Sequence, residues 1–96
     1  MLKFEWDEIK NQINIEKHGI SFEEATSVFY DDEALIITDD EHSVDEERFI
    51  LIGYSIKANL LVVCHCYRES ESIIRIFSAR KATNEERTRY AESYER

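Results

Sequence analysis

Apolar and polar residues alternate in short runs along most of this chain, and these runs predict β-strands. Five such segments, at residues 2–6, 34–38, 48–55, 60–68 and 72–80, are rich in β-branched or aromatic residues. The links at residues 56–59 and 69–71 are short enough for hairpins. We therefore expect an antiparallel meander of about four strands, with a separate short strand at the N-terminus.

Capping signals predict helices before and after the meander. Asp7 is a suitable N-cap for a first helix, which ends at Gly19 because glycine tolerates the left-handed conformation of a helix C-terminus. Capping boxes at residues 21–24 and 83–86 begin a second helix and a C-terminal helix. The order is β-α-α-β-β-β-β-α, and 96 residues suffice for one modest core, so we expect a single α+β domain with segregated helices.

The first predicted helix carries two different stripes. Ile9 and Ile13 share one side, whereas Lys10, Asn14 and Lys17 form a second stripe about 100° away. A stripe that contains two lysines is either a solvated face or part of a cationic binding surface. The sequence leaves both interpretations open.

The charge distribution limits the classes of function. The chain has a formal net charge of −9, and residues 1–50 hold 15 acidic and 4 basic side chains, against 6 and 8 in residues 51–96. An acidic protein repels nucleic acid at long range, which argues against a nonspecific coat protein but allows a local basic site or a basic protein partner. No long uncharged apolar run and no secretory signal occurs, so we expect a cytoplasmic protein without a membrane span.

Neither a metal nor a cofactor is expected from the motifs. Cys64 and Cys66 lie in an apolar run, where free cysteines are usually buried, reduced thiols. A zinc site with the intervening His65 would need four ligands at spacings such as CxxC, and these are absent. The two glycines of the chain, Gly19 and Gly53, do not form a phosphate-binding loop.

The predicted last strand carries three cations, Arg75, Arg80 and Lys81, in this acidic chain. Strand alternation places Arg75 on one face with Phe77, and Arg80 on the other face with Ser78. A guanidinium fits phosphate or carboxylate in a bidentate fork, so this strand is a candidate phosphate site. The alternatives are ion pairs with the chain's own acids and, at the strand end, solvated side chains.

His65 and Tyr67 share a face of the preceding strand and can transfer protons if that face is open to solvent. Otherwise they belong to the core, with satisfied polar tips. RNA cleavage without a metal needs a base for the 2′-hydroxyl, an acid for the leaving oxygen and cations for the transition state. Proton-transfer candidates beside a cationic strand suit that reaction. By contrast, we expect His42 to be an exposed histidine of an acidic loop, and Arg48 to neutralise the acids before it or to join the site.

Several motifs, in order and over nearly the whole chain, resemble the BrnT toxins. They are Phe4-Glu5-Trp6-Asp7, Lys10, Asn14, residues 17–25 (K-H-G-I-S-F-E-E-A), Glu41-His42-Ser43, residues 46–49 (E-E-R-F), Gly53, Leu61-Val62-Val63 and residues 75–82 (R-I-F-S-A-R-K-A). The resemblance implies the fold of RelE-like ribonuclease toxins, a small α+β domain with an antiparallel sheet. It also implies endoribonuclease activity that arrests translation, on or off the ribosome.

The resemblance further implies a partner, a BrnA antitoxin with a ribbon-helix-helix DNA-binding part, so that operator DNA is reached only through the antitoxin. Carried over residue by residue, it points to Lys17, His18, Arg75, Ser78 and Arg80, and less directly to Arg48. Ribonuclease toxins of this fold tend to be basic, whereas this chain is acidic. The alternative is therefore a non-catalytic binding module that retains the antitoxin and operon-regulation role.

Together the residues and the resemblance define the predicted site. Its catalytic candidates are Lys17, His18, His65, Arg75, Ser78 and Arg80, and its RNA-binding candidates are Lys10, Arg48, Tyr67 and Lys81.

Overall fold

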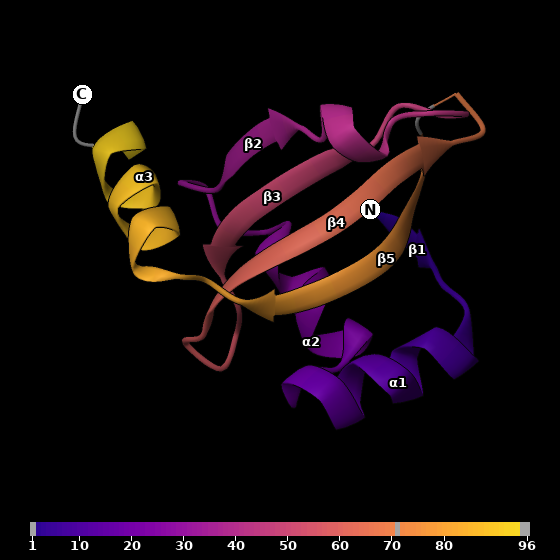
Figure 1. Cartoon of the computed structure of the whole chain (residues 1–96), viewed down its shortest axis with the longest axis horizontal. Helices are drawn as coiled ribbons and strands as arrows, with labels where there is room; N and C mark the ends of the chain where they lie inside the picture. The colour runs from indigo at the N-terminus through magenta and orange to yellow at the C-terminus, as the bar shows by residue number, and fades with distance from the viewer. Residues whose placement is uncertain (1, 71, 95–96) are drawn as a thin grey trace.

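A five-stranded sheet organises the computed structural model, which describes residues 2–70 and 72–94 (Figure 1). The strands are β1 (Lys3–Glu5), β2 (Leu35–Thr38), β3 (Phe49–Tyr54), β4 (Leu60–Arg68) and β5 (Ile73–Lys81). The helices are α1 (Glu8–His18), α2 (Phe22–Val28) and α3 (Asn84–Tyr94), with a 3₁₀ turn, η1, at Asp40–His42. Among these described helices, none combines the length and the apolar character that a membrane crossing requires.

The strand order is β1-β5-β4-β3-β2, and β2 to β5 form the antiparallel meander that the sequence predicts. β1 is the separate N-terminal strand, and it pairs in parallel with only the first part of β5, from Ile73 to Arg75. The later part of β5 therefore runs past the end of β1. That part of β5 carries the residues that matter for the site.

Helices cover the two faces of the sheet unequally. α1 and α2 lie together below the sheet in Figure 1, whereas α3 stands apart at its left end. Phe22 and Val28 of α2 are fully buried in one cluster with the α1/α2-facing residues of β4 and β5. On the other face, Tyr90 of α3 packs against Ile52 and Leu60. Because α3 covers only one end of that face, the remainder stays open for a site.

α1 presents asparagines to the protein and isoleucines to solvent. Asn11 and Asn14 are buried, whereas Ile9 and Ile13 are 72% and 55% exposed. The Asn14 amide donates through Nδ2 to the Ala79 carbonyl at 2.7 Å, and its Oδ1 accepts from the Ala79 N–H at 3.2 Å. These two bonds replace the strand partner that β5 lacks beyond β1, since buried backbone groups must be paired. The stripe of Lys10, Asn14 and Lys17 therefore faces β5, and the two lysines flank it.

A β-bulge in β5 changes the faces that strict alternation predicts. Cys64 pairs with Ser78 while the next residue, His65, pairs with Ile76, so that Phe77 is an extra residue. Ile76 and Ala79 are both buried in the core under α1 and α2, three positions apart. A bulge of this kind shifts the alternation by one residue. The prediction that Arg75 and Arg80 lie on opposite faces is therefore wrong, because both lie on the face opposite α1 and α2.

Candidate functional site

A groove of about 390 Å³ lies on the face of the sheet opposite α1 and α2. Its floor is mostly apolar and comes from the central strands, through Ile50, Val62 and Cys64, with Phe77 at the bulge. Its polar lining residues come from α1, the β2–β3 loop and β5, and they are Lys10, Asp39, His42, Arg48, Ser78 and Arg80. Three of these six side chains carry a positive charge, so the groove concentrates cationic side chains in an acidic protein.

Arg80 enters the groove from β5 and is held by α3. Its two terminal nitrogens bind the two oxygens of Glu86, each at 2.8 Å. Glu86 also accepts the Thr83 N–H at 2.8 Å, and its own N–H donates to the Thr83 hydroxyl, which confirms the predicted capping box. The hydrogen bond from Arg80 is the largest cause that lowers the Glu86 pKa to about 2. The guanidinium is therefore oriented at the start of α3.

Arg48 reaches the groove from the loop between β2 and β3. Its guanidinium carbon lies 3.9 Å from the centre of the Phe77 ring, in a cation–π contact. The nearest carboxylate oxygen, on Glu46, is 3.9 Å away, and the buried Arg48 Nε has no hydrogen-bond partner among the described residues. Arg48 is thus held in place by an aromatic ring and retains an unused donor.

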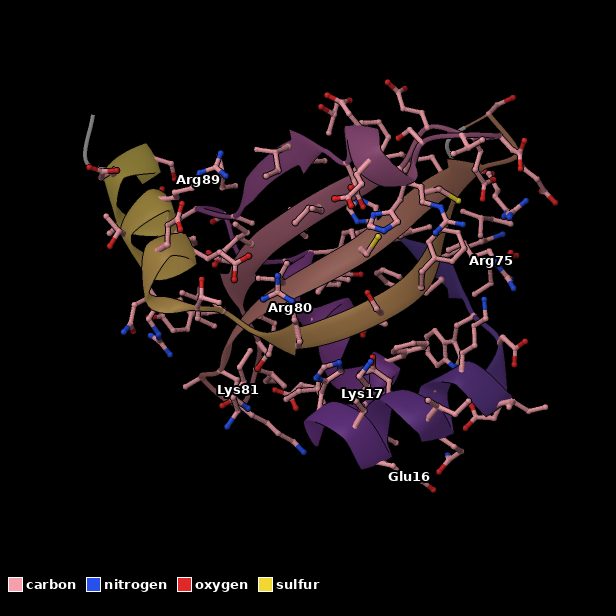
Figure 2. The ribbon with its side chains drawn as sticks, viewed as in Figure 1. Glu16, Lys17, Arg75, Arg80, Lys81 and Arg89 are labelled. Atoms are coloured by element: carbon pink, nitrogen blue, oxygen red, sulfur yellow. The ribbon has the colours of Figure 1, made fainter. Side chains whose placement is uncertain are left out.

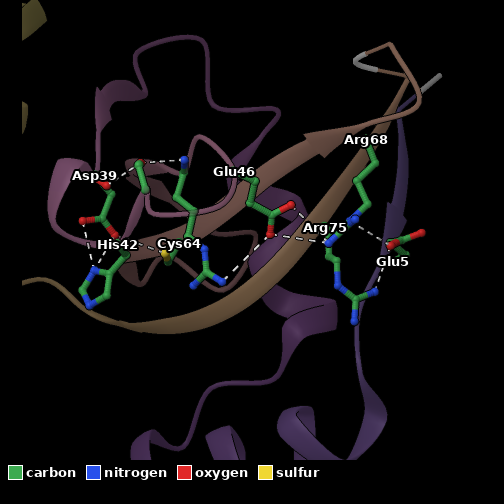
Figure 3. A network of polar contacts seen from close by, with 9 residues as sticks. Glu5, Asp39, His42, Glu46, Cys64, Arg68 and Arg75 are labelled. Carbon is green, nitrogen blue, oxygen red and sulfur yellow. Dashed lines mark hydrogen bonds and ion pairs between the residues drawn. The ribbon is translucent and has the colours of Figure 1, made fainter.

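Arg75 takes part in an ion-pair network outside the groove. It binds Glu5 of β1 at 2.8 Å, and Glu5 lies 3.5 Å from Arg68, which in turn lies 3.4 Å from Glu46 (Figure 3). Figure 2 shows Arg75 and Arg80 toward opposite ends of β5. Of the two interpretations that the sequence left open for Arg75, the structure shows the ion pair with the chain's own acid.

His65 and Tyr67 share a face of the sheet as predicted, but it is the face that α1 and α2 cover. His65 is fully buried, with its ring centre 4.8 Å from that of Phe29 and its Nε2 3.4 Å from the Tyr67 hydroxyl. Burial lowers the His65 pKa to about 4, so the ring is neutral at pH 7. The expectation that this pair and the arginines form one site is wrong, because the sheet separates them.

Two of the other predicted residues line the groove, whereas Lys17, His18 and Lys81 are not part of its lining. Lys10 lines it from α1, and Ser78 lines it from the bulge with an exposed side chain. Lys17 is exposed two turns after Lys10 on the same stripe, and His18 is half-buried at the helix end. Lys81 is exposed at the end of β5 (Figure 2).

His42 is a groove residue that the sequence interpretation assigned only to an exposed loop. Its Nδ1 lies 2.9 Å from Oδ2 of Asp39, and 60% of the His42 side chain is exposed against 9% of that of Asp39 (Figure 3). The Cys64 thiol donates to the same carboxylate at 3.5 Å, and burial, aided by Asp39, raises its pKa to about 11. The D-x-x-H spacing could have indicated this pair, since residues three apart meet on one side of a helical turn.

The Arg80–Glu86 pair predicts an acid-sensitive contribution to stability. The Glu86 pKa is about 2 in the folded chain and 4.5 in the reference state, so its contribution is complete above pH 4.5 and is lost as pH falls toward 2. Glu86→Gln should remove about 1–2 kcal/mol of this pH dependence. The effect is no larger because water screens the charge of the half-exposed Arg80 and weakens the ion pair. Urea denaturation at pH 5 and pH 2.5 measures it. Glu85→Gln, in the same helical turn, is the control, and an equal pH dependence in both variants would contradict the prediction.

Comparisons with known proteins agree with this architecture. A family described as "Ribonuclease toxin, BrnT, of type II toxin-antitoxin system" matches residues 6–86. The fold is similar to the crystal structure of the Brucella abortus ribonuclease toxin BrnT, with a TM-score of 0.65 and 23% identity over 88% of this chain and 100% of that chain. Curated protein sequences gave no match. The chain belongs to the BrnT family of ribonuclease toxins of type II toxin-antitoxin systems.

Proposed function

We propose that this chain is a metal-independent endoribonuclease that cleaves RNA in the groove and thereby arrests translation. The observation that carries the proposal is the convergence of Lys10, Arg48 and Arg80 on one groove of a chain with a net charge of −9. Such a groove creates a local positive field for a phosphate, while the acidic remainder limits nonspecific RNA binding.

The groove residues suit the charge changes of RNA cleavage. Attack of a 2′-hydroxyl on the neighbouring phosphate builds negative charge on the non-bridging oxygens, and fixed cations lower the energy of that state. Both arginines line the groove, Arg48 from the β2–β3 loop and Arg80 from β5. We assign the phosphate to these two arginines, with the Ser78 hydroxyl and the Lys10 ammonium as further donors.

The predicted residues outside the groove receive other roles in this proposal. Lys17, His18 and Lys81 lie outside the groove lining, at the C-terminal ends of α1 and β5. In this proposal they would contact nucleotides that flank the cleaved bond. Arg75 supports the sheet through Glu5, whereas the buried His65 and its neighbour Tyr67 maintain the core behind the groove.

Single-turnover cleavage of RNA by the purified chain, with and without ribosomes, tests the proposal. The double variant Arg48→Ala/Arg80→Ala should cleave about 100-fold more slowly or worse, because each charged hydrogen bond to the phosphate is worth about 1.5–3 kcal/mol. Arg87→Ala/Arg89→Ala, which removes two exposed arginines of α3, is the charge-matched control and should cleave as the wild type does. Intact RNA with the wild type in both conditions would refute the ribonuclease function.

We also propose a BrnA-like ribbon-helix-helix antitoxin as the partner, with operator DNA bound only through it. Membership of a type II toxin-antitoxin family implies an antitoxin, and the net charge of −9 suits a basic partner. A gene for a short basic ribbon-helix-helix protein beside this one would identify the candidate. That protein should co-purify with this chain and suppress RNA cleavage at equimolar amounts, and unchanged cleavage would contradict the assignment.

The alternative is a non-catalytic module that retains only the antitoxin and operon-regulation role. One observation favours it, because Arg80 and Arg75 are already paired with carboxylates of the same chain, Glu86 and Glu5. The cleavage assay separates the two functions, since the module would bind antitoxin and leave RNA intact.

A further inference from the structure

We propose that His42, oriented by Asp39, is the catalytic residue that accepts the proton from the attacking 2′-hydroxyl. This inference rests on the proposed ribonuclease function and adds to it the group that the arginines cannot supply. An arginine stays protonated and acts only as a donor, so a groove built from arginines alone stabilises charge without accepting a proton. His42 lines the same groove as Arg48, Ser78 and Arg80.

The contact with Asp39 fixes which nitrogen of the His42 ring can act as a base. Nδ1 lies 2.9 Å and 3.1 Å from the two carboxylate oxygens of Asp39. An ionised carboxylate only accepts hydrogen bonds, so the proton of the neutral ring resides on Nδ1. Nε2 then keeps its lone pair on the side away from Asp39, and most of the ring is exposed. The carboxylate also stabilises the imidazolium that forms when Nε2 takes a proton.

Hydrogen bonds within the β2–β3 loop fix the position of Asp39 relative to Arg48. The Asp39 N–H donates to the Arg48 carbonyl at 2.8 Å, and the Ser43 hydroxyl donates to the Asp39 carbonyl at 2.7 Å. Ser43 Oγ also accepts the Arg48 N–H at 2.9 Å. The proposed base and one phosphate-binding arginine therefore belong to a single hydrogen-bonded loop. Such positioning is what proton transfer in a transition state requires.

The other titratable groups within reach are less suitable as bases. The Cys64 thiol, with a pKa of about 11, remains protonated and serves as a donor to Asp39. His65 is fully buried on the opposite face of the sheet. Lys10 and Arg80 bring positive charge and donors to the groove. Among the described residues that line the groove, His42 therefore combines an accessible lone pair with a fixed orientation.

The proposed reaction moves the proton of the 2′-hydroxyl to His42 and cleaves the bond from phosphorus to the 5′-oxygen. Nε2 of His42 takes the proton of the 2′-hydroxyl while the 2′-oxygen forms a bond to phosphorus. The bond from phosphorus to the 5′-oxygen breaks, and that oxygen leaves with the electron pair and takes a proton from solvent water. The imidazolium then returns its proton to solvent. The products are a 2′,3′-cyclic phosphate end and a 5′-hydroxyl end, without an oxidant, a reductant or a further reactant.

The experiment measures single-turnover cleavage of a short RNA, and binding of the same RNA with a 2′-deoxynucleotide at the cleaved position. His42→Ala should slow cleavage by about 10²–10⁴-fold, the usual contribution of general acid–base catalysis, while the binding affinity changes less than about threefold. Added imidazole should restore at least about tenfold of the lost rate in His42→Ala. A merely structural role of His42 would show no such rescue.

Asp39 is a positioning residue in this scheme, so its effect should depend on His42. Asp39→Asn should slow cleavage at least about tenfold in the wild type and have little further effect in His42→Ala, as coupled residues do. Asp40→Asn removes an equal charge from an exposed neighbour in the same turn and should leave the rate unchanged.

The outcomes separate this inference from the function on which it rests. If the wild type cleaves RNA, and if His42→Ala loses a rate that imidazole restores, both the ribonuclease function and the role of His42 are supported. Cleavage at equal rates by the wild type and His42→Ala, or a loss that imidazole does not restore, overturns the role of His42 and leaves the ribonuclease function standing. Absence of cleavage by the wild type, with and without ribosomes, overturns the ribonuclease function and the inference together.

Discussion

Asn14→Ala is expected to lower the free energy of unfolding by about 3–5 kcal/mol. The Asn14 side chain makes three buried hydrogen bonds, to both backbone groups of Ala79 and to the Ile20 carbonyl at 2.8 Å. Alanine would leave these three groups unpaired, and each buried unpaired group costs about 1–3 kcal/mol. The loss is a large part of the 5–15 kcal/mol that typically separates folded from unfolded states.

Urea denaturation at pH 7 measures this loss, with Ile13→Ala as the matched control. Ile13 is one residue before Asn14 on α1, but its side chain is 55% exposed, so its truncation should change stability by less than about 1 kcal/mol. Asn14→Asp keeps the shape of the side chain and removes its N–H donors, so it should also destabilise strongly. Similar midpoints for Asn14→Ala and Ile13→Ala would refute the idea that Asn14 acts as the missing strand partner of β5.

Asn14→Ala should also change the position of the side chains that line the groove. Ala79 lies between Ser78 and Arg80 in β5, and both of these residues line the groove. Loss of the Asn14 bonds frees the backbone of this segment, so the guanidinium of Arg80 is less well positioned. Cleavage by Asn14→Ala should therefore fall even at temperatures at which the chain remains folded.

The sequence predicts those parts of the fold whose causes are local. The hairpins depend on short links between strands, and the capping box of α3 depends on Thr83 and Glu86, three residues apart. The inward orientation of Asn14 has a different origin. Its partner Ala79 is 65 residues away in the chain. A polar side chain is needed there because β1 pairs with β5 only as far as Arg75 and leaves the backbone of Ala79 without a strand partner on that side. A hydrophobic pattern alone favours burial of Ile9 and Ile13 and gives the opposite orientation.

The site was predictable to a similar extent. The cationic character of β5 is visible in the sequence, but a single extra residue at Phe77 decides which side chains share a face. The alternation of apolar and polar residues within one strand cannot reveal a bulge, because a bulge is defined by how that strand pairs with its neighbour. His42 and Arg48 come from a loop about 30 residues earlier in the chain, and only the folded sheet brings them next to Ser78 and Arg80.

His65 leads to the second large expected effect, a loss of about 3 kcal/mol of stability when pH falls from 6.5 to 4. Burial holds the His65 pKa at about 4, against 6.5 in the reference state. Between these values the unfolded chain binds a proton that the folded chain does not bind, so stability is complete above pH 6.5 and falls as pH decreases toward 4. One pKa unit corresponds to about 1.4 kcal/mol, which gives the size of the loss.

His65→Leu should abolish this part of the pH dependence, because leucine fills the space between Phe29 and Tyr67 without titrating. Urea denaturation at pH 7 and pH 4.5 gives the comparison, and the carboxylates of the chain titrate alike in both proteins and cancel in the difference. Val63→Ala is the control, since it also truncates a fully buried side chain of β4 but keeps His65, and therefore should retain the wild-type dependence on pH. An equal loss of stability in His65→Leu and in the wild type would show that His65 does not remain neutral in the core. A neutral, buried His65 cannot exchange protons with an RNA bound in the groove as proposed, so this measurement also bears on the proposed choice of His42 as the base.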